Sequence, residues 1–164
     1  MTMPNVGAPA APFTLTGIDG NTYSLQEGLD RGPVLLVFFK TTCGTCNLAV
    51  PYYNRLRQAY PQDGWQLWAI SQDGLEATQR YAEKYQLAFP VLLDGKGWPV
   101  SRAYDPPSTP TFYLLDRDST IAAANTGFSK DDMNHLARVL AERVGAQPVA
   151  VAPADDGNPP FRPG

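Results

Sequence analysis

The sequence has one histidine, two cysteines and no long apolar segment, and each shortage argues against a class of protein. A structural zinc site takes more Cys and His ligands than this chain provides, so we expect no metal. No stretch approaches the roughly 18 apolar residues of a membrane-spanning helix. Segment 1–13 has neither a basic start nor a continuous apolar run, unlike a secretory signal. We therefore expect a cytoplasmic protein, or an exported one if a leader has been removed.

An excess of charge of one sign is also missing. The 164 residues include 13 Lys and Arg and 16 Asp and Glu, for a net charge of −3. Nucleic acids and anionic membranes are bound by clustered basic side chains, so we expect neither as a partner. A hydrophobic fraction of 43% at this length suits one globular domain with a buried core.

The end of the chain differs in composition from the rest. Segment 146–164 contains five prolines and few apolar side chains, which predicts a flexible or extended tail. We therefore divide the chain into a folded domain over residues 1–145 and a Pro/Ala-rich C-terminal tail over residues 146–164. Asp155 and Asp156 are interpreted as solubilising charges. The tail side chains that could dock on the domain are Val149, Val151 and Phe161.

Patterns typical of strands and of helices alternate along most of the chain. Alternating apolar and polar residues around the Asp19-Gly20 turn predict a β-hairpin near the start. Continuous apolar runs predict buried strands, and apolar residues at helical spacing predict helices between them. Such an order indicates an α/β domain with a partly parallel central sheet that ends in an antiparallel strand pair. The expected strands lie within 13–25, 33–39, 65–71, 89–94 and 110–128, and the helices within 43–59, 74–87, 97–105 and 129–145.

Cys43 and Cys46 lie three positions apart, where a buried strand gives way to a helix. A structural disulfide over so short a loop would remove little entropy from the unfolded chain. Covalent haem attachment needs a histidine directly after the second cysteine, where Asn47 stands. A helix that begins near Cys43 instead points free N–H groups and the positive end of its dipole at that sulfur, which favours the thiolate. We therefore predict that Cys43 attacks a substrate disulfide and that Cys46, the more shielded thiol, resolves the mixed disulfide.

Neighbouring residues are expected to shape the surface that faces the substrate. Gly44 lets another chain approach closely, and Thr45 offers a hydroxyl to the helix terminus. Trp98, in a loop before Pro99, packs in the core or borders the substrate surface. His135 is expected on a solvated helix face.

These features resemble the thioredoxin-like superfamily, and within it the TlpA/ResA-type thiol–disulfide oxidoreductases of the redoxin group, which includes the AhpC/TSA peroxiredoxins. The resemblance covers about residues 7–144. Its motifs are "VGAPAAPFTLTGIDGNTYSL", "VLLVFFKTTCGTC", "STPTFYLLD" and "TGF", with Pro51 five residues after Cys46. It implies a thioredoxin-like fold, with a central mixed β-sheet flanked by helices and an N-terminal β-hairpin. It also implies an enzyme without a cofactor.

The resemblance further implies a substrate-binding set beside the two cysteines. Pro110 is implied to be a cis-proline, and the backbone of Thr109 is implied to hold a substrate chain by strand-like hydrogen bonds. A trans proline that starts an edge strand is the alternative. Thr42, Gly44 and Thr45 complete the set. The expected partner is a disulfide- or dithiol-bearing protein or a small-molecule thiol, and we expect a monomer.

Three positions depart from the family's pattern. The buried acid of thioredoxin falls on Val37, and the TlpA/ResA-type acid three residues after the second cysteine falls on Ala49. These two replacements remove the usual proton acceptors for Cys46. The tryptophan that usually precedes the first cysteine is replaced by Thr42, which changes the surface that faces the substrate.

The main alternative is a peroxiredoxin-like thiol peroxidase, with Cys43 as the peroxidatic and Cys46 as the resolving cysteine. Thr41 is similar to the threonine of the peroxiredoxin pattern, but Val37 stands where the matching proline would fall. Peroxide reduction also needs a donor near the attacked O–O bond, and Arg102 or Arg117 could serve. A second alternative is a binding module that kept the fold without the chemistry.

Overall fold

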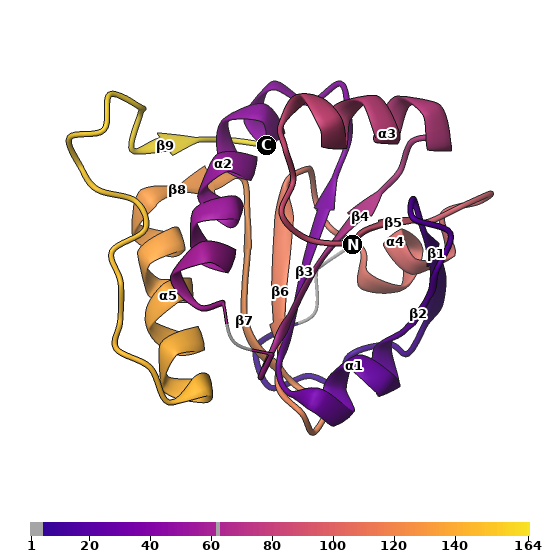
Figure 1. Ribbon diagram of the computed structural model, residues 1–164, viewed down its shortest axis with the longest axis horizontal. Coiled ribbons are helices and arrows are strands. Elements are labelled where there is room, and N and C mark those ends of the chain that lie inside the picture. The colour runs from indigo at the N-terminus through magenta and orange to yellow at the C-terminus, as the bar shows by residue number, and fades with distance from the viewer. Residues whose placement is uncertain (1–4, 62) are drawn as a thin grey trace.

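A mixed sheet of seven strands forms the centre of the computed structural model, which describes residues 5–61 and 63–164 (Figure 1). The strand order is β2-β1-β5-β4-β3-β6-β7. β3, β4 and β5 are parallel to one another, with β4 in the middle. On its other side, β3 pairs antiparallel with β6. The strands are β1 (Thr14–Gly17), β2 (Thr22–Ser24), β3 (Val34–Phe39), β4 (Gln66–Ser71), β5 (Val91–Leu93), β6 (Thr111–Leu115) and β7 (Ile121–Thr126). The predicted mixed sheet, N-terminal hairpin and final antiparallel pair are thus confirmed.

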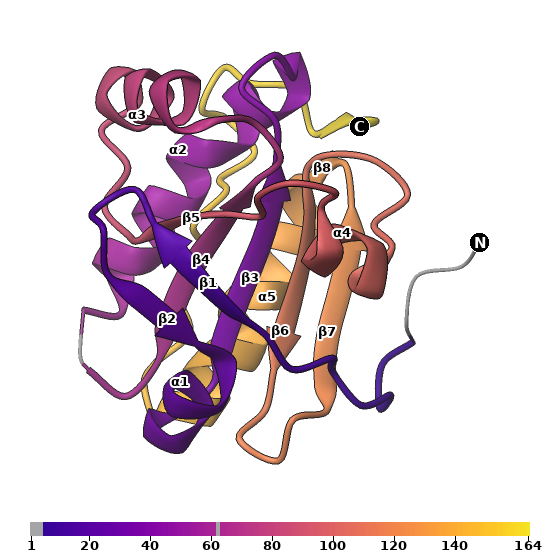
Figure 2. The same ribbon diagram turned by 90° about the vertical axis from the view of Figure 1, so that its right-hand side faces the viewer.

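Helices cover both faces of this sheet, and the side chains of β3 alternate between them. Leu35, Val37 and Phe39 belong to a core cluster under α2, α3 and α5, whereas Leu36 and Phe38 pack with α1 and α4. Figure 2 shows α4 in front of the sheet and α5 behind it. Every residue of β3 is buried, as its continuous apolar run predicts. The helices are α1 (Leu25–Arg31), α2 (Gly44–Ala59), α3 (Leu75–Lys84), α4 (Pro99–Tyr104) and α5 (Lys130–Val144).

One predicted helix is shorter than its sequence pattern. The apolar spacing extends to Leu87, but α3 ends at Lys84, and Gln86 has a left-handed backbone with φ 49°. Leu75, the first residue of α3, is 46% exposed, because α3 contacts the core mainly through Thr78 and Tyr81. None of the helices in the described part of the chain has an apolar stretch that could span a lipid bilayer.

The topology brings four loops to one edge of the sheet. β3 and β4 are parallel and therefore end at the same edge. β6 runs antiparallel to β3, so it begins at that edge, and β7 ends there beside the start of β6. The loop that carries Cys43 consequently meets the loops after β4, before β6 and after β7.

Segment 146–164 lies against the domain and runs back beside α5 towards the start of α2 (yellow in Figure 1). Val151, one of the three tail side chains named as docking candidates, is 4% exposed and belongs to the core cluster under α2 and α5. The side chains of Val149 and Phe161, the other two docking candidates, are 44% and 61% exposed. The segment ends in β9 (Phe161–Arg162), which pairs antiparallel with β8 (Phe128–Ser129).

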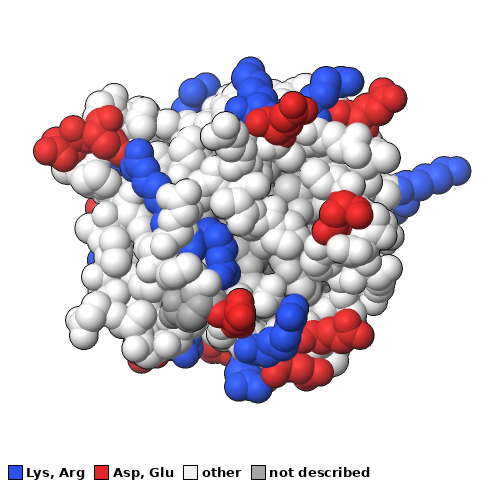
Figure 3. Space-filling model, in the orientation of Figure 1, with Lys and Arg blue, Asp and Glu red and all other residues white. Residues whose placement is uncertain are grey.

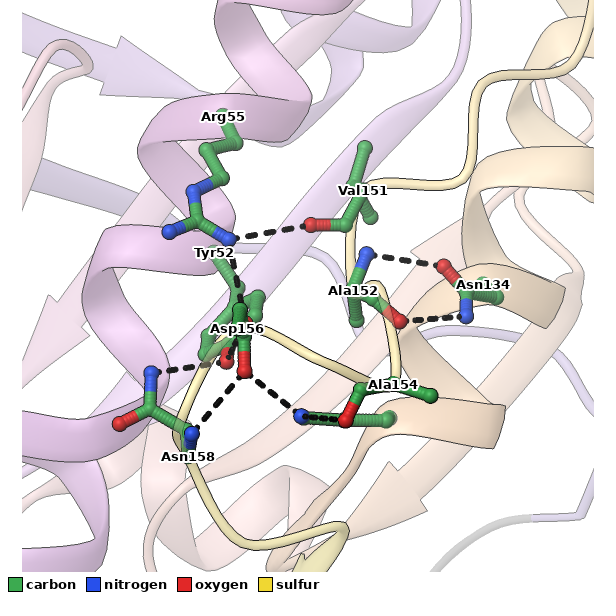
Figure 4. Close-up of polar contacts among 9 residues, drawn as sticks. Tyr52, Arg55, Asn134, Val151, Ala152, Ala154, Asp156 and Asn158 are labelled. Carbon is green, nitrogen blue, oxygen red and sulfur yellow. Dashed lines mark hydrogen bonds and ion pairs between the residues drawn. The ribbon is translucent and has the colours of Figure 1, made fainter.

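Polar contacts attach the middle of the tail to α2 and α5 (Figure 4). Lys130, which is 5% exposed, places its Nζ 2.6 Å from Asp156 Oδ1, and the Tyr52 hydroxyl donates to Asp156 Oδ2 at 2.5 Å. These two partners hold the pKa of Asp156 well below its usual range. Asn134 also exchanges two hydrogen bonds of 2.9 Å with the backbone of Ala152. Asp156 is therefore an anchor of the tail, which corrects its interpretation as a solubilising charge.

The exposed charges on one face of the molecule follow a different pattern (Figure 3). Acidic and basic side chains are interspersed on the face shown in Figure 3. Such pairs of exposed charges contribute little to stability. The buried ammonium of Lys130 differs from them, because its carboxylate partner cannot be replaced by water at little cost.

We predict that Asp156→Asn releases the tail and that the neighbouring change Asp155→Asn does not. The first variant leaves the buried Lys130 ammonium without its carboxylate, whereas Asp155 is exposed. Hydrogen exchange at the amides of Ala152 and Lys130, which bond to Asn134 and Pro160, should accelerate at least about tenfold in Asp156→Asn alone.

Acid should release the tail of the unaltered protein as well. The pKa of Asp156 is lowered in the folded state, so the stability that its carboxylate contributes to the docked tail is complete at neutral pH and is lost as pH falls below about 4.

Equal amide protection in the two variants, or protection in Asp156→Asn that matches the unaltered protein, would contradict this account of the anchor.

Candidate active site

Cys43 occupies the N-cap of α2, which places its sulfur at the free end of the helix backbone. The Cys46 N–H donates to Cys43 Sγ at 3.1 Å, the bond that a Ser, Thr or Asp oxygen accepts in an ordinary cap. On its other side the Cys43 thiol donates to the carbonyl oxygen of Thr109 at 3.3 Å. The sulfur therefore lies between the start of a helix and the loop before β6.

The two thiols have different access to solvent. Both are free, Cys43 is half-buried and Cys46 is fully buried one turn into α2. Burial has the largest effect on the Cys46 thiol and raises its pKa. The hydrogen bond of this thiol with the Cys43 side chain raises the pKa further. The backbone of Lys40 and the side chain of Thr109 oppose that shift with a smaller effect. The predicted order, an accessible first thiol and a shielded second one, is confirmed.

The loop before Cys43 is held by a carboxylate from the neighbouring strand's loop. The Thr41 N–H donates to Asp73 Oδ2 at 2.6 Å, and the Asp73 N–H in turn donates to Ser71 Oγ at 3.1 Å. Sequence reasoning missed Asp73. The signal for it was an acid just after a buried strand that ends at the same edge of the sheet as β3.

The loop before β6 has the conformation that the family resemblance implies. The peptide bond between Thr109 and Pro110 is cis. Thr109 is half-buried and directs its carbonyl oxygen to Cys43, while Pro110 is buried and accepts a 2.8 Å hydrogen bond from the Gly127 N–H. The structure thus brings together Cys43, Thr109 and Pro110, which are 67 or fewer positions apart in sequence.

The remaining members of the expected substrate-binding set are divided by exposure. Thr42 and Gly44 are exposed beside Cys43. Thr45 is only 5% exposed, and its hydroxyl donates to the carbonyl oxygen of Pro163 at 2.7 Å. It therefore does not cap the helix, because the N-cap position belongs to Cys43. The tail covers it, a contact that sequence reasoning did not find.

No described carboxylate forms a hydrogen bond with either sulfur. Val37 and Ala49, which stand at the positions of the usual acids, are 2% and 1% exposed and belong to the apolar cluster that contains Cys46. The described residues likewise contain no cluster of three or more His, Cys, Asp or Glu side chains that could hold a metal ion. Apolar side chains thus surround the shielded thiol.

A cleft of about 730 Å³ adjoins the exposed side of Thr42. Lys40 and Arg102 line it together with Asp105, so the cleft contains charges of both signs. Trp98 also lines the cleft and is 50% exposed. Its indole Nε1–H donates to the backbone carbonyl oxygen of Gln72, another residue of the cleft wall. Of its two alternatives, Trp98 therefore takes the one at the surface near the cysteines.

Two residues considered in the sequence lie away from this cleft. Arg117, a candidate peroxide donor, bonds the backbone of Asp30 at the end of α1. His135 is exposed on α5, as expected. Arg102 is the candidate donor that lies near Thr42.

Comparison with known proteins shows which family this chain belongs to. The model of the AhpC/TSA family matches residues 6–124. The chain belongs to the AhpC/TSA family. The thiol–disulfide oxidoreductase ResA of Geobacillus kaustophilus is 31% identical over 134 residues, which are 80% of this chain and 76% of that protein. ResA of Bacillus cereus is 32% identical over 117 residues, or 71% of this chain and 66% of that protein. This AhpC/TSA protein is thus a homologue of thiol–disulfide oxidoreductases, as its cysteine pair predicts.

Solved structures confirm the thioredoxin-like fold. A candidate thiol:disulfide interchange protein DsbE from Chlorobium tepidum superposes with a TM-score of 0.77 at 26% identity, over 86% of this chain and 99% of that one. Peroxidoxin BcpB from Mycobacterium tuberculosis has a TM-score of 0.70 at 21% identity, over 87% of this chain and 97% of that one. The second likeness shows the shared fold alone.

The raised pKa of Cys46 predicts a pH dependence for its attack on a mixed disulfide at Cys43. Below its pKa, the thiolate fraction of Cys46 rises about tenfold per pH unit, so resolution should accelerate steadily from about pH 6 to pH 9. Ellman's reagent measures this step, because the first thionitrobenzoate is released on attack and the second on resolution. Cys46→Ser, which should release only the first, is the control. A second phase whose rate is independent of pH would contradict the assignment.

Proposed function

We propose that this AhpC/TSA protein is a thiol–disulfide oxidoreductase in which Cys43 attacks and Cys46 resolves. One observation carries the proposal. The accessible sulfur of Cys43 accepts the backbone N–H of the shielded Cys46 at 3.1 Å, so the free end of α2 holds Cys43 Sγ against the turn that carries Cys46. The relatives named ResA support the reaction class.

The reaction moves two electrons from the dithiol to a substrate disulfide. Cys43 thiolate attacks one sulfur of the substrate, forms a mixed disulfide and releases the other substrate sulfur as a thiolate. Cys46 then loses its proton and attacks Cys43 Sγ. The internal disulfide forms, and the second substrate sulfur leaves as a thiolate that takes up a proton. The reverse sequence oxidises a dithiol.

The proton of Cys46 needs an acceptor, and among the described residues the apolar cluster around this thiol supplies no carboxylate. The substrate thiolate released in the first step forms beside the two cysteines at the moment when Cys46 must be deprotonated. We propose that this thiolate, or water, accepts the proton. The shielded thiol then stays neutral until a substrate has reacted, which limits its oxidation in the absence of substrate.

Substrate positioning is proposed to involve the exposed residues around Cys43. Thr42 and Gly44 flank the sulfur, and the backbone of Thr109 faces it across 3.3 Å. The adjoining cleft, with Trp98 and charges of both signs, offers room for the side chains next to a protein disulfide. We therefore favour a disulfide- or dithiol-bearing protein as the substrate.

Replacement of each cysteine tests the two roles separately. Cys43→Ser should lower the rate of insulin reduction, with dithiothreitol as the electron donor, by at least about a thousandfold, because the nucleophile is lost. Cys46→Ser should retain the first attack and accumulate one mixed disulfide per chain, detected by intact mass. Insulin reduction that persists in Cys43→Ser, or a mixed disulfide on Cys46 in that variant, would overturn the assignment.

A thiol peroxidase is the second candidate, because a guanidinium lies beside Gly44, the residue that follows the reactive cysteine. Arg162 Nη2 would lie 2.9 Å from a Cβ placed on Gly44. A cation there could stabilise a peroxide as Cys43 thiolate attacks it, which would give a sulfenic acid and water before Cys46 resolves the acid to a disulfide. The rate of Cys43 oxidation by hydrogen peroxide decides the question. A rate no faster than that of free cysteine would reject the peroxidase.

A further inference from the structure

The final described residues of the tail cross the start of α2 next to Cys43. We call residues 161–164 the tail tip. Its Pro163 accepts the 2.7 Å hydrogen bond from the Thr45 hydroxyl, and its Arg162 guanidinium lies over Gly44. Two residues of the C-G-T-C motif are therefore in contact with the tail tip.

The opposite side of the tail tip contacts the loops before β6 and after β7. A Cβ on Gly164 would collide with the Ser108 hydroxyl and would lie 2.7 Å from the Thr109 carbonyl oxygen. A Cβ on Gly127, whose φ is 77°, would lie 3.1 Å from the Arg162 carbonyl oxygen. The tail tip thus lies between the helix that carries the cysteines and the loop that the resemblance assigns to substrate binding.

The tail tip has the conformation of a bound peptide. Arg162 and Phe161 of β9 pair antiparallel with Phe128 and Ser129 of β8, and the Lys130 N–H donates to the Pro160 carbonyl at 2.9 Å. An extended segment that adds a strand to a protein edge is a common mode of peptide recognition. Here the chain provides both the edge and the peptide.

The tail tip is held more weakly than the part of the tail that precedes it. Residues 161–164 are all exposed, and β9 has only two residues. The anchor before them contains the buried Val151 and Ala152 and the ion pair between Lys130 and Asp156. The tail tip can therefore detach while the anchor holds it near the groove, as a competitor with a high effective concentration.

We propose that the tail tip occupies the substrate groove in place of a substrate chain, and that an extended protein segment must displace it to reach Cys43. The inference rests on the proposed disulfide chemistry of Cys43. Cys43 is half-buried with the tail tip in place, so small disulfides reach its sulfur without displacement. The tail tip consequently selects between substrates by size and by their ability to add a strand beside β8.

Removal of residues 161–164, with the chain ended at Pro160, tests the proposal directly. If the open groove is populated about one-tenth of the time, kcat/KM for insulin reduction should rise about tenfold in the shortened protein. The value for Ellman's reagent should change less than about twofold, because this small disulfide does not need the groove. An unchanged or lower value for insulin would overturn the proposal.

Point variants provide a second route that keeps the chain length. Asp156→Asn weakens the anchor and should raise kcat/KM for insulin in the same direction as the deletion, whereas the exposed Asp155→Asn should leave it unchanged. Protection of the Ala152 amide in the shortened protein would show that the anchor is still in place. Equal activities in the two point variants would count against the tail tip as a competitor.

Alkylation separates this proposal from the proposed function, because it needs no turnover. A polyethylene-glycol maleimide should modify Cys43 about tenfold faster in the shortened protein, whereas iodoacetamide should react at nearly the same rate in both. Faster bulky alkylation in a protein that reduces no disulfide would reject the enzyme and retain the occupied groove. Normal insulin reduction with equal alkylation rates would retain the enzyme and reject the occupied groove.

Discussion

The hydrogen bond from the Cys46 N–H to the Cys43 sulfur connects the chemistry of this protein to its backbone. It exists because α2 begins directly after the buried central strand β3, so that the first free N–H groups of the helix point at the sulfur. The Asp73 carboxylate holds the preceding loop through Thr41, and the Thr109 carbonyl lies opposite the sulfur. Together these contacts hold the accessible thiol in place, whereas the apolar cluster that contains Val37 and Ala49 buries the thiol of Cys46.

The tail and the reactive cysteine share the helix α2. Tyr52, in the middle of α2, bonds the anchoring Asp156, while Thr45, in its first turn, bonds Pro163. The ion pair that anchors the tail and the reactive sulfur are therefore connected through one helix. Because the buried Lys130 requires a charged partner, the anchor stays docked at neutral pH and holds the tail tip near the groove.

Contacts that are local in sequence were predictable, and contacts that join distant polar residues were not. The apolar run of β3, the change to helical spacing after it and the helix start at Cys43 each have a periodic or local chemical signal. From these signals the α/β architecture and the positions of the accessible and the shielded thiol could be predicted. The bonds from Thr41 to Asp73 and from Thr45 to Pro163 span 32 and 118 positions. Polar, Pro-rich segments have no periodicity that reveals where they dock, so the contacts of the tail with α2 and with the loop before β6 appeared only in the structure.

A redox titration against glutathione tests the central claim most directly. The account predicts that Cys43 and Cys46 interconvert between a dithiol and one internal disulfide in a single two-electron transition, followed by intact mass and thiol counting. Tenfold changes in the equilibrium constant then correspond to about 30 mV. Two cysteines that titrate independently, or thiols that never form the internal disulfide, would contradict it.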